Sequence, residues 1–170
     1  MKRLLVAMAG VISLAGGSSH AQGLTATTAF ERLKALEGEW VDADGFFGKQ
    51  GAVAVTYKVT GGGTAVMEAF PAGTPAEMVT VYHKDGNDLV LTHYCSEGNQ
   101  PRMRASQMTA NSVSFDFAGG TNIDPNVTSH MHAVKIEFLG PDEIRATWVN
   151  WDHGKEAPEH RGVFRVTRKK

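Results

Sequence analysis

Cysteine is almost absent from this sequence, in which Cys95 is the single one. One cysteine cannot form a disulfide within the chain, so a disulfide-stapled scaffold is excluded and packing has to stabilise the fold. Long apolar runs are missing as well. After residue 21 no stretch approaches the roughly 20 apolar residues that a membrane-spanning helix needs, so we expect no transmembrane segment.

An excess of charge of one sign is also missing. The 17 Lys and Arg residues nearly balance the 18 Asp and Glu residues, which predicts no nucleic-acid partner. Common catalytic motifs are absent too: the sequence has no Gly-x-Ser-x-Gly, no Gly-x-x-x-x-Gly-Lys and no His-Glu-x-x-His. We therefore assign no catalytic residue, find no motif that requires a cofactor, and favour a non-enzymatic function.

The N-terminus contains the three parts of an export signal. A basic pair, Lys2 and Arg3, precedes an apolar stretch over 4–16, and the segment ends in the small-x-small pattern Ser19-His20-Ala21. Residues 1–21 are predicted to be a secretory signal peptide cleaved near Ala21, which implies a periplasmic or secreted protein. Cleavage changes the net charge from −1 to −3, because it removes two basic residues.

The remaining chain is long enough for one domain, predicted over 28–170 after a flexible N-terminus at 22–27. A single helix is predicted over 28–37. Thr28 and Glu31 have the spacing of a capping box, and Gly38 is suited to ending the helix.

After Trp40 the pattern changes to short segments rich in β-branched and aromatic residues, separated by Gly, Pro, Asn and Asp. Short links such as Gly61-Gly62-Gly63 and Asp85-Gly86 favour up-and-down connectivity. Closing the sheet removes its edges, so an all-β, antiparallel barrel of about ten strands is predicted after the helix, with a two-sheet sandwich as the alternative. The predicted strands are 39–43, 51–60, 64–70, 77–84, 87–95, 101–108, 111–118, 130–139, 142–151 and 161–168.

The junction between helix and first strand reads Leu-Glu-Gly-Glu-Trp over 36–40. A short helix followed by Gly-x-Trp resembles the start of the barrel in lipocalins and related calycins. In that superfamily the Trp closes one end of the barrel, and an Arg from the last strand lies across it. The resemblance implies structural roles for Gly38 and Trp40, with Arg165 or Arg168 as the arginine.

A longer resemblance covers nearly all of the chain after residue 21. The segments Glu-Met-Val-Thr-Val-Tyr-His at 77–83, Leu-Val-Leu-Thr-His-Tyr-Cys at 89–95 and Gly-Asn-Gln-Pro-Arg-Met at 98–103 are similar to a family of bacterial exported proteins of unknown function. This resemblance implies export and a lipocalin-like fold, and it supplies no catalytic residues.

Side chains alternate along a strand, so the more apolar face of each predicted strand is expected to point inward. The inward sets are Leu89, Leu91, His93 and Cys95; Val113, Phe115 and Phe117; His130, His132, Val134, Ile136 and Phe138; and Ile144, Ala146, Trp148 and Asn150. In two sets the polar residues stand at one end, so His93, Cys95, His130 and His132 are expected near one mouth of the barrel.

This His/Cys cluster has two interpretations. Imidazole and thiolate are ligands for zinc, copper or haem iron, which makes a metal or haem site one hypothesis. His-x-His without a third ligand fixed by the sequence is a weak signal, however. We therefore favour interior polar groups that hydrogen-bond to neighbouring strands, with Cys95 as a small buried side chain.

Arg102 and Arg104 share one face of their strand. An inward pair could hold an acidic head group, although alternation favours Met103 and Ala105 as the inward residues. With the His/Cys cluster, Trp148 and Asn150, the two arginines complete the set of candidate ligand contacts. The predicted function is an exported lipocalin-like barrel that binds a small apolar or amphipathic molecule; the alternatives are a metal- or haem-binding barrel and a non-catalytic envelope interaction module.

Overall fold

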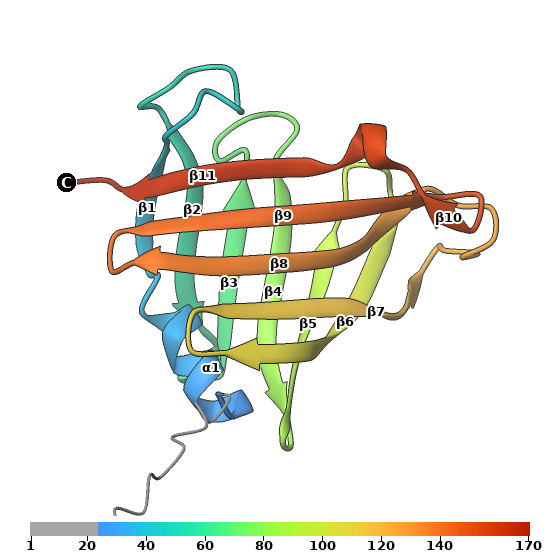
Figure 1. Cartoon of the computed structure of the whole chain (residues 1–170), viewed down its shortest axis with the longest axis horizontal. Coiled ribbons are helices and arrows are strands. Elements are labelled where there is room, and N and C mark those ends of the chain that lie inside the picture. Colours follow the sequence, from blue (N-terminus) through green and yellow to red (C-terminus); the bar gives the residue numbers. More distant parts are fainter. Residues whose placement is uncertain (1–23) are drawn as a thin grey trace, which may run out of the picture.

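The computed structural model describes residues 24–170 and contains a closed antiparallel barrel (Figure 1). Ten strands close the barrel, one further short strand extends it, and one helix precedes the first strand, as the sequence predicted. The predicted signal peptide lies outside the described residues. Within them, no helix has the length and apolar character needed to cross a membrane.

Each barrel strand pairs with its neighbour in the chain, and pairing of β11 with both β9 and β1 completes the circle. This closure excludes the two-sheet sandwich. The additional strand β10 pairs only with the end of β9. The strands are β1 (Gly38–Asp42), β2 (Val53–Thr60), β3 (Ala65–Phe70), β4 (Met78–Asp85), β5 (Asp88–Tyr94), β6 (Gln100–Thr109), β7 (Ser112–Thr121), β8 (His130–Gly140), β9 (Glu143–Asp152), β10 (Lys155–Glu156) and β11 (Gly162–Arg168). Two single-turn 3₁₀ helices, η1 (Gly61–Gly63) and η2 (Pro158–His160), lie between strands.

The helix α1 (Ala26–Lys34) starts earlier than the sequence predicted. Thr25 caps it, because the Thr25 hydroxyl accepts a hydrogen bond from the Thr28 amide at 3.2 Å. Thr28 is therefore a first-turn residue, and the predicted capping box is wrong. The segment expected to be flexible contacts the barrel from Leu24 onward, since the Leu24 amide donates to the Met108 carbonyl at 3.2 Å.

Trp40 and α1 fill one end of the barrel, the closed end. The Trp40 side chain is fully buried, and its indole N–H donates to the Leu36 carbonyl at 2.8 Å. The Arg168 guanidinium lies 4.5 Å from the centre of the Trp40 ring and donates to the Ala35 and Glu37 carbonyls at 2.8 and 2.9 Å. These bonds satisfy carbonyls just after α1, so Arg168 ties the last strand to the helix.

Arg165 does not lie across Trp40, the position that the family resemblance implied for either Arg165 or Arg168. Its guanidinium donates to Asp44 at 2.6 Å and to Glu143 at 2.7 Å. Two carboxylates therefore hold it on the outer surface, and Arg168 alone of the two arginines lies across Trp40.

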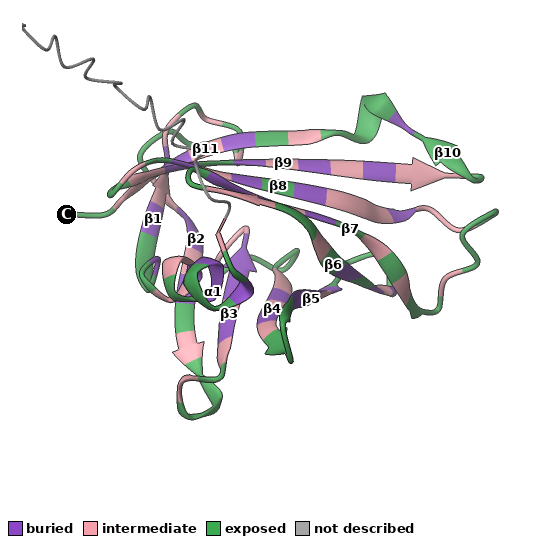
Figure 2. Ribbon diagram, turned by 60° about the horizontal axis from the view of Figure 1, so that its bottom comes forward, coloured by how far each residue is buried: buried purple, intermediate pink, exposed green. Residues whose placement is uncertain are grey.

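The interior of the barrel between its two ends is tightly filled. Buried and more exposed residues alternate along β8 and β9 (Figure 2). Most residues predicted to point inward are buried in the core, including Leu89, Leu91, Val113, Phe115, Val134, Ile136, Phe138, Ile144, Ala146 and Trp148. Such a core leaves the ends of the barrel as the places for a ligand site.

Candidate functional site

A pocket of about 530 Å³ lies at the end of the barrel opposite α1. The long loops β1–β2, β3–β4 and β9–β11 meet there, whereas the short turns of the barrel lie at the closed end (Figure 1). We call this the mouth pocket. Its apolar lining is formed by Phe46, Phe47, Phe70, Pro71, Ala76, Met78, Met131, Trp148 and Phe164, and its polar residues are Ser96, Glu159, His160 and Arg161.

Aromatic rings form most of the apolar lining, and they pack against one another. Phe164 is the central ring, with centroids of Phe47, Phe46 and Phe70 at 4.8, 5.6 and 5.7 Å. The Trp148 ring follows at 5.6 Å from Phe70. Phe46 at the rim leaves half of its surface exposed. These contacts give the pocket flat apolar walls, which suit a planar apolar molecule.

The polar side of the mouth pocket comes from η2 and the residue after it. Glu159, His160 and Arg161 are exposed there, and the Arg161 guanidinium pairs with Glu156. Arg161 already has a carboxylate partner, and Glu159 adds a further negative charge, so the rim offers no unpaired arginine to an anionic group. It suits the neutral polar end of an amphipathic molecule.

His93 lies behind the aromatic lining and is fully buried. Its ring is 4.8 Å from Trp148 and 5.7 Å from Phe70, centroid to centroid. The Nδ1 atom is 2.9 Å from the Thr80 hydroxyl, whereas Nε2 has no hydrogen-bond partner. Burial lowers the pKa of His93 to about 4, so the imidazole is neutral near pH 7.

The other two histidines of the predicted cluster form a separate pair. His130 Nε2 is 3.0 Å from His132 Nδ1, and the His132 ring stacks on Trp151 at 3.8 Å. A register shift between Met131 and Ala133 interrupts the alternation of β8. For this reason His132 is only half-buried, although simple alternation placed it on the inward face.

Cys95 directly follows the last residue of β5 and is half-buried. This partial burial raises the pKa of its thiol. In residues 24–170 no group of three or more His, Cys, Asp or Glu side chains is placed to hold a metal ion. The four residues predicted as candidate metal ligands therefore do not gather into one site.

Arg102 and Arg104 point away from the barrel interior, so the inward arrangement of this pair is wrong. Both are exposed, and Arg104 pairs with Asp88 and Asp85 on the outer surface. Alternation explains the outcome, because Met103 between them is 1% exposed and occupies the inward position.

Asn150, the last candidate contact, is buried near the mouth and donates to the Ser129 hydroxyl at 3.3 Å. It belongs to a polar layer that also includes Asn99, which donates to the Ser129 carbonyl at 2.8 Å. This layer joins the β5–β6 and β7–β8 loops. Of the candidate contacts predicted from sequence, only Trp148 lines the mouth pocket, and His93 supports its wall.

Sequence reasoning missed Phe46, Phe47 and Phe164 as pocket residues. Two of them stand side by side in a loop with Gly45 and Gly48, where aromatic side chains have no strand to pack on. An adjacent aromatic pair in a glycine-containing loop was the available signal. Strand alternation along 161–168 could have placed Phe164 inward, but alternation does not show that an inward residue lies at the mouth.

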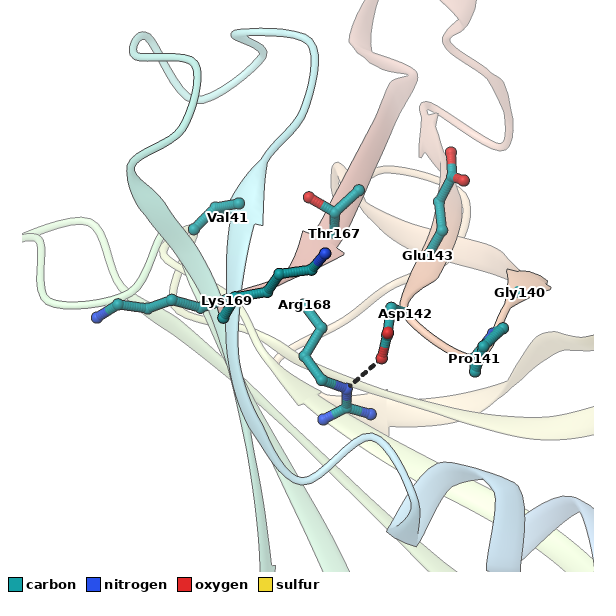
Figure 3. Close-up of a pocket in the computed structure, with 9 residues that line it drawn as sticks. Val41, Gly140, Pro141, Asp142, Glu143, Thr167, Arg168 and Lys169 are labelled. Carbon is teal, nitrogen blue, oxygen red and sulfur yellow. Dashed lines mark hydrogen bonds and ion pairs between the residues drawn. The ribbon is translucent and has the colours of Figure 1, made fainter.

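A second hollow, of about 610 Å³, lies at the closed end between the ends of β1 and β11 and the β8–β9 turn (Figure 3). Two of its basic residues pair with neighbours: Arg168 donates to Asp142 at 3.0 Å (Figure 3), and Lys169 donates to Glu39 at 2.7 Å. These pairs hold the C-terminal end against the barrel. The mouth pocket, with its apolar lining, is the better candidate for a ligand.

Comparisons with known proteins gave no matching family model and no matching curated protein. The fold is compatible with a calycin-type barrel, while membership of the exported family that the sequence resembles stays a prediction.

Proposed function

We propose that this protein is an exported barrel that binds a small, largely apolar molecule with a flat ring system in the mouth pocket. The observation that carries the proposal is the aromatic lining, in which Phe46, Phe47, Phe70, Trp148 and Phe164 converge from four parts of the chain. The volume of about 530 Å³ lies within the range of roughly 300–1,000 Å³ that is typical of small-molecule sites.

Exposure at the rim supports the same proposal. Phe46 is 50% exposed although it lies beside a packed aromatic cluster, so a bound molecule would cover apolar surface that water now contacts.

Export is the second part of the proposal and rests on the pattern of residues 1–21. The compartment and the mass of the protein test it: a chain that begins near Gln22 in the periplasmic extract supports export, and an uncleaved chain that stays with the cytoplasmic fraction contradicts it.

Binding is tested with 2-ethylnaphthalene, a planar hydrocarbon whose fluorescence anisotropy rises when it is immobilised. The matched variants are Phe46→Ser at the mouth and Leu139→Ser at the closed end, since the two side chains are 50% and 44% exposed. We expect Phe46→Ser to weaken binding about fivefold, because about 1 kcal/mol of apolar contact is lost.

Leu139→Ser is expected to bind like the wild type. Equal weakening in the two variants would point to non-specific adsorption of the probe on apolar surface. No saturable binding to the wild type would contradict the proposed function itself.

A further inference from the structure

Three buried side-chain polar atoms in residues 24–170 have no hydrogen-bond partner: His93 Nε2, Trp148 Nε1 and Asn99 Oδ1. Two of them belong to rings whose centroids are 4.8 Å apart, and one of those rings lines the mouth pocket. A buried polar atom left unpaired costs about 1–3 kcal/mol, and native proteins pair nearly all such atoms. Two neighbouring unpaired atoms at one pocket wall therefore point to a partner that belongs there.

The hydrogen bond with Thr80 indicates which nitrogen of His93 carries the ring proton. The Thr80 hydroxyl is fully buried, and its one bond among the described residues is the contact of 2.9 Å with His93 Nδ1. If the hydroxyl donates, its proton is satisfied, Nδ1 accepts and Nε2 carries the hydrogen. The reverse arrangement would leave the buried hydroxyl proton without an acceptor, so the Nε2–H tautomer is favoured.

Both unpaired nitrogens are then hydrogen-bond donors, because an indole N–H can only donate. We propose that His93 Nε2–H and Trp148 Nε1–H together hold a neutral acceptor oxygen, such as a carbonyl, of the molecule that occupies the mouth pocket. This inference rests on the proposed function and narrows its ligand class to planar apolar carbonyl compounds.

A carboxylate is a poorer match for these two donors than a carbonyl. The neutral His93 supplies no positive charge, and Arg161 at the rim is already paired with Glu156. An ionised group buried against two neutral donors would lack a countercharge, which is costly. A carbonyl oxygen accepts two hydrogen bonds without that cost.

Phe70 is the pocket residue whose ring packs against both donor rings. It lines the mouth pocket and packs against both rings, at 5.7 Å from His93 and 5.6 Å from Trp148. Both nitrogens lie below the surface that water reaches, so the proposed hydrogen bonds require side chains at this wall of the pocket to shift on binding. The aromatic part of the ligand then takes the place beside Phe164.

The test compares 2-acetylnaphthalene with 2-ethylnaphthalene, which have nearly the same size and differ in the carbonyl oxygen. Wild-type protein is expected to bind the ketone about tenfold more tightly, the effect of one to two net hydrogen bonds. His93→Phe keeps a ring in place and removes one donor, so it is expected to lose most of this preference while it still binds the hydrocarbon. His132→Phe replaces a histidine of the separate pair and is expected to keep the preference.

Equal affinities of the wild type for ketone and hydrocarbon would overturn the inference and leave the proposed function intact, whereas no binding of either compound would overturn both. If the His93→Phe variant does not fold, the donor pair can still be tested on the wild-type protein. The measurement is the infrared carbonyl stretching frequency of the bound ketone. A frequency lower than that in hexane is expected for a hydrogen-bonded carbonyl. A frequency equal to that in hexane would overturn the donor pair.

Discussion

At the scale of single residues, Glu68 and His93 are two buried ionisable side chains with opposite chemistry. Glu68 is 1% exposed and accepts hydrogen bonds from the hydroxyls of Tyr57 at 2.8 Å and Tyr82 at 2.5 Å. Burial raises the pKa of Glu68 from 4.5 to about 7, although the two hydroxyls oppose the rise. Burial lowers the pKa of His93 from 6.5 to about 4. Both side chains are therefore neutral in the folded protein over much of the range between these values.

The two shifts affect the pH dependence of stability in opposite directions. The contribution of Glu68 is fully present below about pH 4.5 and is lost as the pH rises through about 7. The contribution of His93 is fully present above about pH 6.5 and is lost as the pH falls through about 4. Between about pH 4.5 and 6.5 unfolding releases a proton from Glu68 and binds one at His93, so the two effects offset each other.

Single variants should separate the two effects. In the Glu68→Gln variant only the His93 effect remains. The free energy of unfolding of this variant, relative to that of the wild type, is therefore expected to rise with pH between 4.5 and 6.5. In the His93→Phe variant only the Glu68 effect remains, so its free energy of unfolding relative to that of the wild type is expected to fall with pH over the same range. Each change amounts to at most about 3 kcal/mol, since one pKa unit corresponds to about 1.4 kcal/mol. Urea unfolding at a series of pH values measures both, and parallel curves for the three proteins would contradict the prediction.

At the scale of secondary-structure elements, the closed end depends on contacts between the two termini of the barrel. Trp40 in β1 pairs in register with Arg168 in β11, and the same arginine donates to the carbonyls of Ala35 and Glu37. Arg168 therefore links the last strand to α1 and the first strand, which lie at the other end of the described chain.

Arg168→Met is expected to lower the free energy of unfolding by about 1–3 kcal/mol, because it leaves two carbonyls without their donor and removes the cation from the Trp40 ring. Arg165→Met is the matched control in the same strand. Its pairs with Asp44 and Glu143 are exposed, so a loss of no more than about 1 kcal/mol is expected. Thermal or urea unfolding measures both variants, and equal losses would contradict the role assigned to Arg168.

The elements also show how far the sequence could predict this structure. All ten predicted strands correspond to barrel strands, because alternation and glycine-rich turns are local signals. The start of α1 was misplaced since Thr25 and Thr28 are both suitable capping residues and the sequence does not rank them. The choice between Arg165 and Arg168 depends on pairing of the first strand with the last, which is a non-local property.

The candidate site was less predictable than the strands for the same reason. Alternation placed Trp148 and His93 inward, but the pocket also needs Phe46 and Phe47 from a loop whose path no periodic pattern describes. The bulge in β8 interrupts the alternation that placed His132 inward, and His132 is half-buried against Trp151. Convergence of side chains from different strands depends on bulges and loop paths, which single-strand patterns do not contain.

At the scale of the whole molecule, the two ends of the barrel differ in how they are filled. α1, Trp40 and Arg168 fill one end, the core residues fill the middle, and the longer loops build an aromatic pocket at the other end. A ligand that binds only the folded barrel should stabilise the whole chain by mass action. Binding at the mouth should nevertheless leave contacts at the closed end unchanged.

The most direct measurement of the central claim is a two-dimensional ¹H–¹⁵N NMR titration of the protein with 2-acetylnaphthalene, observing the indole N–H signals of the three tryptophans. The Trp148 signal is predicted to move downfield to saturation as its unpaired N–H finds an acceptor, while that of Trp40, bonded to the Leu36 carbonyl at the closed end, stays in place. An unchanged Trp148 signal at saturating ketone, or a change at Trp40 instead, would contradict a ligand site at the mouth of the barrel.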